Sequence, residues 1–230
     1  MEGVKHFDLA AQPLREINRW LHRDAVAAGV AKVKIVNADG AHSIAAGLNA
    51  ELDVEVEGHA GYYLGGMNQR AHITVRGNAG PGVGENMMSG SIRVEGFAST
   101  AAGASAHGGL LVVQGDAALR CGISLKGGDI VVGGSVGSFS AFMAQAGRMV
   151  ICGDAGDALG DSLYEAVIYV RGEVKSLGAD AQFEPMTDTD RAVVAELLSV
   201  AGFKHDPNEF KRVASAKKLY HWNADAEQEY

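Results

Sequence analysis

Proline and cysteine are scarce in this sequence. The 230 residues include only 4 prolines and 2 cysteines, which excludes a proline-rich disordered chain and a small disulfide-stabilised domain. Cys121 and Cys152 belong to no C-x-x-C grouping, and the histidines show no H-x-x-x-H spacing. We therefore expect two buried thiols and predict no zinc or iron–sulfur site in this chain.

Long apolar runs and an excess of basic residues are also missing. No apolar stretch approaches the length of a membrane span, and the first residues lack the basic-then-apolar layout of a secretory signal. The formal net charge of −8 disfavours nucleic acid as a partner. We expect a cytoplasmic protein that binds neither a membrane nor nucleic acid.

Glycine, by contrast, is abundant and regularly placed. The 31 glycines are about twice the usual share of roughly 7%. Seven of them form a ladder in which each glycine follows the last by nineteen residues: Gly58, Gly77, Gly96, Gly115, Gly134, Gly153 and Gly172. A fixed period of this kind indicates stacked structural repeats.

Two apolar columns accompany the ladder. Four residues before each glycine stand Val54, Ile73, Ile92, Leu111, Ile130, Met149 and Ile168, and two before stand Val56, Val75, Val94, Val113, Val132, Ile151 and Val170. The column between them is mixed, running Glu55, Thr74, Arg93, Val112, Val131, Val150 and Tyr169. This alternation predicts a short strand in every repeat, with the two apolar columns on one side.

Equivalent strands in successive repeats are expected to stack in parallel, about 4.8 Å apart. The predicted fold class is an all-β core, a right-handed parallel β-helix of about seven 19-residue coils, with capping helices at both ends. Its corners use the ladder glycines and others three and seven residues later, which suit a positive φ or a close backbone approach. The expected domains are an N-terminal helical cap (1–32), the β-helix (33–184), and a C-terminal helical cap with a basic, aromatic arm (185–230).

Helical patterns flank the ladder. One runs from Gln12 to Ala28, with Pro13 at its first position, and a second lies between Pro185 and Gly202. Asp39 and Gly40 stand about where a leading coil would place its glycine, nineteen residues before Gly58. The arm from Lys211 to Trp222 is expected to lie on another surface or to pack on its own domain.

Bulky and polar residues interrupt the less regular half of some repeats. They pack either inside the rod and at its corners, or form an interface or the lining of a passage against a partner, because methionine and aromatic residues are enriched at interfaces. The candidates for the second role are Tyr62, Tyr63, Met67, Glu85, Asn86, Met87, Phe139, Phe142, Met143, Tyr220 and Trp222.

No pattern of catalytic residues is recognisable. Asp154, Asp157 and Asp161 lack the spacing of a calcium loop and are better explained as corner residues that support turns. The glycine-rich run 80–84 leads into another strand, whereas a phosphate-binding loop opens a helix. No serine stands in a nucleophile elbow. We predict no catalytic, cofactor-binding or metal-binding residues in this chain.

The ladder and its corner segments resemble the GXGXG β-helix family, which includes the C-terminal domain of glutamate synthase large subunits. The resemblance is carried by residues 80–90, 153–162 and 174–180. The ending, from Glu209 to Tyr220, is similar to stand-alone subunits of this kind, in particular the β-helix subunit of N-methylglutamate synthase (methylamine–glutamate N-methyltransferase).

This resemblance implies a non-catalytic subunit of a three-chain complex. The expected partners are a class II glutamine amidotransferase-like subunit and a glutamate-synthase-like subunit that carries FMN and iron–sulfur clusters, with no cofactor in this chain. The β-helix would hold the two catalytic centres in register across a passage for ammonia or amine. The complex would make N-methylglutamate from glutamate and methylamine and release ammonia.

Two alternatives belong to other classes or complexes. A stand-alone β-helix enzyme of the acyltransferase type would repeat in hexapeptides with eighteen-residue coils, which a nineteen-residue register contradicts. A scaffold subunit of a formylmethanofuran-dehydrogenase-like complex shares the ladder but not the C-terminal arm. Genomic neighbours or co-purified chains would separate these alternatives.

Overall fold

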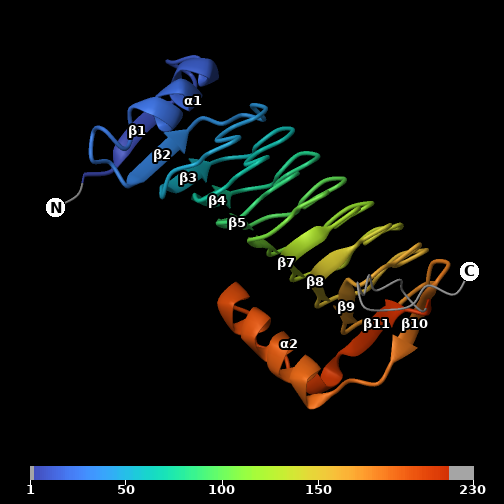
Figure 1. The fold of residues 1–230 in the computed structure, drawn as a ribbon. Coiled ribbons are helices and arrows are strands. Elements are labelled where there is room, and N and C mark those ends of the chain that lie inside the picture. The colour runs from blue at the N-terminus through green and yellow to red at the C-terminus, as the bar shows by residue number, and fades with distance from the viewer. Residues whose placement is uncertain (1–2, 218–230) are drawn as a thin grey trace, which may run out of the picture.

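The computed structural model describes residues 3–217 and contains one sheet that runs the length of a rod (Figure 1). Its 11 strands lie in the order β1-β2-β3-β4-β5-β6-β7-β8-β9-β11-β10. The elements are β1 (Lys5–Asp8), α1 (Leu14–Arg23), β2 (Lys32–Val36), β3 (Asp53–Glu57), β4 (His72–Arg76), β5 (Ser91–Val94), β6 (Leu110–Val113), β7 (Lys126–Val132), β8 (Ala146–Ile151), β9 (Val167–Val170), β10 (Ala181–Glu184), α2 (Asp188–Ala201), the 3-10 helix Pro207–Glu209 and β11 (Lys211–Ser215). Neither α-helix among these residues is long and apolar enough to cross a membrane.

The strands β3 to β9 stack in parallel, as the ladder predicts. Val54 pairs with Ile73, Ile73 with Ile92, and the same nineteen-residue offset continues to Ile168. A second line of bridges joins residues two places after each ladder glycine, from Ala60 through Ala79 to Val174. The all-β parallel solenoid of about seven turns is therefore confirmed.

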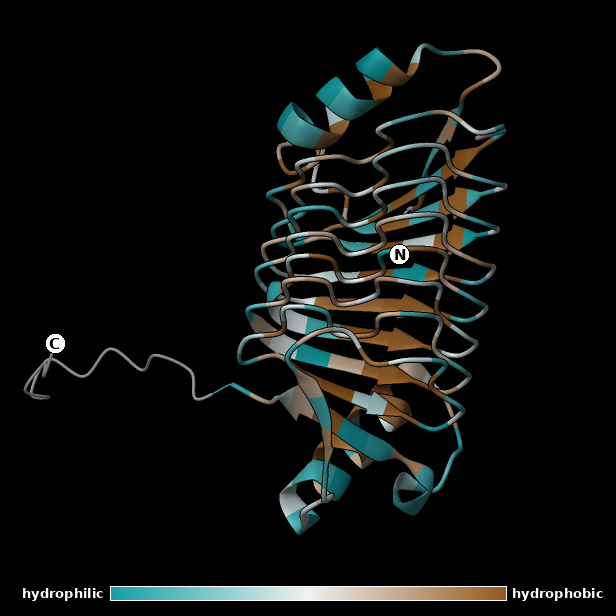
Figure 2. Ribbon diagram, turned by 90° about the vertical axis from the view of Figure 1, so that its right-hand side faces the viewer, coloured by the Kyte–Doolittle hydropathy of each residue, from teal (hydrophilic) through white to brown (hydrophobic). Residues whose placement is uncertain are grey.

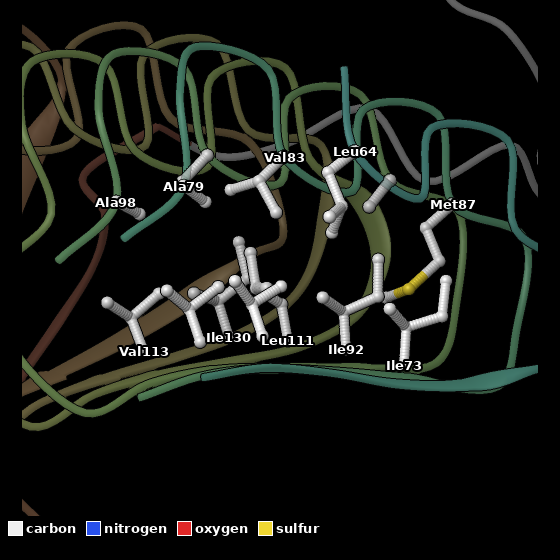
Figure 3. Packing of buried hydrophobic residues seen from close by; sticks show 14 of the residues in the cluster. Leu64, Ile73, Ala79, Val83, Met87, Ile92, Ala98, Leu111, Val113 and Ile130 are labelled. Carbon is white, nitrogen blue, oxygen red and sulfur yellow. The ribbon is translucent and has the colours of Figure 1, made fainter. Parts of the chain in front are cut away.

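The interior of the rod is filled by the two apolar columns. Ile73, Ile92 and Leu111 are at most 1% exposed and lie in a row along the inside of the sheet (Figure 3). Leu64 and Val83 meet this row from the opposite wall of the coil (Figure 3). Burying one such side chain contributes about 1.5–3 kcal/mol, and each packs largely against neighbouring coils, so coils stabilise one another.

The glycine columns meet two different needs. A Cβ at Gly77 would lie 2.6 Å from the carbonyl oxygen of Gly58, because consecutive coils approach closely at this corner. Of the ladder glycines only the first, Gly58, has a positive φ, of 96°. The glycines seven residues further on are left-handed instead, as at Gly103 with φ 67°. Close approach explains the ladder, and backbone conformation explains the second column.

The leading coil is longer than nineteen residues. β2 pairs with β3 at an offset of twenty-one, with Val33 beside Val54. At the corner that follows, Ala38 lies beside Gly58, because a Cβ at Gly58 would lie 3.9 Å from Ala38. Asp39 and Gly40, both with positive φ, form the turn directly after Ala38, so the expected position of this corner is off by one residue. A further strand that the sequence patterns did not indicate, β1, pairs in parallel with β2 and extends the sheet.

The first helix closes the N-terminal end of the rod. α1 is shorter than the predicted span from Gln12 to Ala28, since Pro13 is extended with ψ 134° and the helix ends at Arg23. Its apolar stripe is buried, while its other side is largely hydrophilic (Figure 2). Asn18 ties the helix to the leading coil by donating to the carbonyl oxygen of Ser43 at 2.9 Å. Trp20 packs edge-on against Phe7.

The second helix lies along the flank of the rod, beside the last strands of the sheet (Figure 1). Its buried residues Val194, Leu197, Leu198 and Ala201 form one apolar cluster with the outward-facing side chains of β6 to β9, namely Val112, Val131, Val150 and Tyr169. A helix near each end of the chain was predicted. The lateral position of α2 was not predicted, because the outward column of strand residues that it covers was interpreted only as mixed.

The predicted basic arm begins as a strand. β11 enters the sheet between β9 and β10 and is antiparallel to both. The alternative in which this segment packs on its own domain is therefore correct for 211–215. Tyr220 and Trp222 lie outside the described residues.

Candidate functional site

The half of each coil opposite the sheet carries a repeated run of left-handed residues. Positive φ values recur five, seven and nine places after the ladder glycines, for example at Tyr63, Gly65 and Met67 with φ 63°, 60° and 55°. The N–H groups of Tyr63 and Met67 donate to the next coil, at 2.9 and 2.8 Å, whereas that of Gly65 donates to the preceding one at 3.0 Å. This alternation turns the middle residue inward and the two flanking residues outward.

Eight of the nine candidate residues in the described part, all except Met87, form two groups at or beside these outward positions. In the first group, the rings of Tyr62 and Tyr63 stack with centroids 5.4 Å apart. A Cβ at Gly66 would lie 2.4 Å from the Tyr63 ring, so glycine makes room for that ring against the backbone. Met67 beside them is 48% exposed.

Polar groups of the next coil complete this first cluster. Burial raises the pKa of Tyr63, partly offset by a hydrogen bond between its side chain and that of Asn86. A Cβ at Gly82 would lie 2.8 Å from a carboxylate oxygen of Glu85 and 3.3 Å from the ring of Tyr62, so both groups lie over this glycine. We name Tyr62, Tyr63, Met67, Glu85 and Asn86 the tyrosine cluster.

A second cluster lies on the same side of the rod, further along it. The rings of Phe139 and Phe142 meet edge-on with centroids 6.2 Å apart, and Phe139 and Met143 are 44% and 40% exposed. Phe139 occupies the coil position of Tyr63 four coils later, which corresponds to about 19 Å along the rod at 4.8 Å per coil. We name Phe139, Phe142 and Met143 the phenylalanine cluster. The candidates thus form two separate patches.

Met87 belongs to neither patch. Its side chain is 1% exposed and points into the core beside Ile73 and Ile92 (Figure 3). Its inclusion among the interface candidates is therefore wrong. Position ten after the ladder glycine faces inward, and its residues, mostly apolar, are all buried: Asn68, Met87, Ala106, Leu125, Ala144 and Leu163.

The polar residues at the corners bind the coils together. One place after the ladder glycine, Asn78 Oδ1 accepts from the N–H of Phe97 at 3.0 Å, and Asp154 Oδ1 accepts from that of Glu173 at 2.8 Å. The carboxylate of Asp157 accepts from Lys175 Nζ at 2.7 Å, and Asp161 Oδ2 accepts from the N–H of Ala179 at 3.4 Å. The expectation that the aspartates support corners therefore holds for all three. Within residues 3–217 no group of three or more His, Cys, Asp or Glu side chains could hold a metal ion.

Both thiols are buried, as expected. Cys121 lies in the interior of the rod, and burial raises its pKa to about 12. Cys152 belongs to the apolar cluster under α2, where burial raises its pKa to about 11. The two thiols therefore lie in different apolar environments and are neither nucleophilic nor placed as a ligand pair at neutral pH.

Two features of the surface escaped the sequence analysis. The outward column changes from Glu55, Thr74 and Arg93 to Val112 and its successors where α2 begins to cover the sheet, and this change was a readable signal. The left-handed positions five and nine residues after the ladder glycines are occupied by residues as different as tyrosine, alanine, arginine, methionine and serine. These positions share no residue type, so the sequence did not indicate them.

Comparison with known proteins shows a close relationship. No family model matches the chain. Protein GlxC of Rhizobium meliloti (strain 1021) is 54% identical over 219 residues, which cover 95% of this chain and 96% of that protein. The similarity thus extends over the helices, the whole rod and the closing strands.

Proposed function

Because the chain belongs to the family of Protein GlxC, and because its glycine ladder resembles that of glutamate synthases, we propose that it is a non-catalytic scaffold subunit of a glutamate-synthase-like complex. The finer proposal is N-methylglutamate synthase, which joins methylamine to glutamate and releases ammonia. The proposed location of the complex is the cytoplasm.

The observation that carries this proposal is the nineteen-residue register that the apolar columns keep from β3 to β9. It holds across all seven strands apart from a local shift at the start of β7, and polar side chains at the corners hydrogen-bond from coil to coil. Such a rod keeps two attached proteins at a fixed separation, which a flexible linker does not do. The corner Asn and Asp side chains are engaged in this stacking, which supports a structural role for them.

The proposed partners are a class II glutamine amidotransferase-like subunit and a subunit that carries FMN and iron–sulfur clusters. The two buried thiols of this chain are too few for an iron–sulfur cluster, which takes four cysteine ligands. We assign the clusters, and FMN with them, to the partner. Coupling of the two centres across an ammonia or amine passage is the role proposed for the rod.

We assign one partner contact to the tyrosine cluster. Tyr62 and Met67 are about half exposed, and the Tyr63 ring is fixed against Gly66. Aromatic groups that are held in place before binding lose little entropy on association and are common hot spots. Glu85 and Asn86 add polar groups at the edge of the same patch.

Co-expression with the genes that neighbour this one tests the proposal. We expect the chain to co-purify with two larger subunits and to migrate with them on a sizing column. Glutamine-dependent or amine-dependent synthesis should fall when the chain is omitted. A chain that migrates alone, with partners that retain full coupled activity without it, would contradict a scaffold role.

Replacement of Tyr62 and Met67 by serine tests the assigned contact. We expect loss of one co-purified subunit with an unchanged melting temperature, because both side chains are at the surface. Val200→Ser is the matched control, since Val200 is an equally exposed apolar residue, 56% exposed, on the outer side of α2. Equal retention of both subunits in all variants would show that the tyrosine cluster is not the contact.

A further inference from the structure

The rings of the tyrosine cluster are held in place by the coils around them. The N–H of Tyr62 donates to His42 Nδ1 at 2.8 Å, and the Tyr62 and His42 rings meet edge-on with centroids 6.4 Å apart. Tyr62 also stacks on Tyr63, whose ring lies against Gly66. With these contacts made, Tyr62 is still 47% exposed. The cluster therefore presents an aromatic surface that is fixed before any partner binds.

A carboxylate lies at the edge of this aromatic surface. A Cβ at Gly82 would lie 2.8 Å from Glu85 Oε2 and 3.3 Å from Cε2 of Tyr62. The carboxylate and the ring edge therefore meet over the same glycine. A group that contacts the exposed ring of Tyr62 from outside is thus within reach of the negative charge of Glu85.

The described part of the chain supplies no cation to Glu85. Within residues 3–217 its carboxylate forms neither an ion pair nor a hydrogen bond. Two arginines of the nearby coils are engaged with other carboxylates, since Arg70 pairs with Glu51 at 2.6 Å and Arg76 with Glu55 at 2.8 Å. The negative charge beside the tyrosine rings is therefore uncompensated, in a chain whose formal net charge is already −8.

An exposed aromatic ring next to an unpaired carboxylate has the chemistry of a site for a guanidinium group. Aromatic faces attract a cation that lies within about 6 Å of the ring centroid. The guanidinium group is planar, so it stacks on such a ring, and it binds a carboxylate through two parallel N–H donors. Tyr62 and Glu85 offer both of these contacts over one glycine. One guanidinium group therefore uses both at once.

Met67 suits the remainder of an arginine side chain. Its N–H donates to the carbonyl oxygen of Glu85 at 2.8 Å, and its own side chain is 48% exposed. Arginine stems pack along apolar surface while the charged head stays accessible to water. The ammonium group of a lysine would meet the charge of Glu85 but would not stack on the flat ring of Tyr62. The cluster therefore matches arginine better than lysine.

We propose that the tyrosine cluster receives an arginine side chain of a partner protein, with its guanidinium group stacked on Tyr62 and bound to the carboxylate of Glu85. This inference rests on the proposed function only in taking the partner to be one of the two larger subunits. The uncompensated charge of Glu85 also makes the contact selective, because an acidic surface would be repelled there.

Binding of the co-expressed subunits to variants of the full chain tests this contact. Glu85→Gln keeps the size of the side chain and removes its charge, so the affinity for one subunit should fall at least about tenfold and depend less on salt. Tyr62→Phe keeps the ring and should bind as the wild type does, whereas Tyr62→Leu should weaken binding by a similar factor. Glu173→Gln, at a side chain that is 93% exposed, is the matched control. Unchanged binding of Glu85→Gln, or equal binding of the two Tyr62 variants, would overturn the proposal.

The isolated full-length chain tests the site without the complex. The probe is N-acetylarginine methylamide, and N-acetylnorleucine methylamide is the uncharged control of similar length. We expect the arginine probe alone to shift the amide resonances of the tyrosine cluster in NMR spectra, and Glu85→Gln to abolish these shifts. Equal shifts with both probes, or shifts confined to other surfaces, would overturn the arginine site. If the probe binds as expected but no subunit co-purifies with the wild type, the arginine site stands and the scaffold role fails.

Discussion

The guanidinium group of Arg93 donates a hydrogen bond to the carbonyl oxygen of Ala201 at 2.8 Å, and a second to that of Val200 at 3.0 Å. Arg93 is the last polar residue of the outward column, and Ala201 is the last residue of α2. The pair therefore places the end of the helix at the boundary between the polar and the apolar halves of the sheet. A cation at a helix C-terminus also interacts favourably with the helix dipole.

Replacement of Arg93 by alanine is expected to loosen this end of α2. Loss of hydrogen bonds from a charged donor typically costs about 1.5–3 kcal/mol, and the partial exposure of Arg93 places it at the low end of that range. Urea unfolding measures the change in the free energy of unfolding, and amide exchange locates it in the last turn of α2. Arg70→Ala is the control, because Arg70 pairs with Glu51 at an exposed site where little change is expected. Equal effects of both substitutions would contradict the assignment.

Tyr169→Phe should detach the start of α2 from β9. The Tyr169 hydroxyl donates to Asp190 Oδ1 at 2.7 Å in a buried position, and burial raises the pKa of Tyr169, which keeps this proton in place. A lost hydrogen bond to a charged group costs about 1.5–3 kcal/mol. Denaturant unfolding measures the change in the free energy of unfolding. Tyr164→Phe, at an exposed tyrosine, is the control. An unchanged midpoint for Tyr169→Phe would show that the contact contributes nothing.

The same carboxylate is expected to make stability depend on acidity. Burial alone would raise the pKa of Asp190, but hydrogen bonds from Thr187 and Tyr169 outweigh it and hold the pKa below its ordinary 3.8. A lowered folded-state pKa stabilises the protein above the unfolded-state value, and this stabilisation is lost as the pH falls through the folded-state value. Asp190→Asn should therefore flatten the loss of stability below about pH 4 in acid titrations of unfolding. A variant profile parallel to the wild type would contradict this.

Gly77→Ala tests the close approach of coils at the ladder. The new Cβ would lie 2.6 Å from the carbonyl oxygen of Gly58, so the backbone must shift, and overpacking of this kind costs about 1–3 kcal/mol. Thermal unfolding should show a lower midpoint. Gly3→Ala, where a Cβ meets nothing within 4 Å, is expected to leave the midpoint unchanged. A stable Gly77→Ala protein would show that the coils can separate locally without cost.

The two thiols should be unreactive in the folded protein. Burial raises the pKa of Cys121 to about 12 and that of Cys152 to about 11, so almost no thiolate is present at pH 8. A thiol-specific chromogenic reagent should modify neither cysteine in buffer and both in urea. Rapid modification of either cysteine in the folded state would contradict the packing described for that residue.

The fold was predictable to the extent that it repeats. Nineteen-residue periodicity and two apolar columns determine the solenoid, the strands and the buried face, because stacked coils require the same residue type at the same position. The features that occur once were not predictable in this way. β1, the twenty-one-residue leading coil and the insertion of β11 between β9 and β10 each lack a repeated signal.

The candidate surface was predicted in part for the same reason. Bulky residues such as Tyr63 and Phe139 stood out against the glycine-rich repeat and do lie on the outside, whereas Met87, one place beyond its outward neighbour, faces the core. Inward and outward positions in this half of the coil depend on the alternation of left-handed residues. The left-handed backbone conformation is adopted equally by residues as unlike as Arg120 and Ala101, so the residue types do not reveal it.

The constant offset between β3 and β9 has a consequence for how this protein can change in evolution. Extra residues can lengthen a single coil between its strands, as in the leading coil, without changing its rise along the rod. Gain or loss of a complete coil would change the length of the rod and leave every remaining interface intact. The distance between anything attached near β3 and anything attached near β9 can therefore be altered only in increments of about 4.8 Å. The length of the rod therefore changes in steps of one coil, and each coil is nineteen residues long.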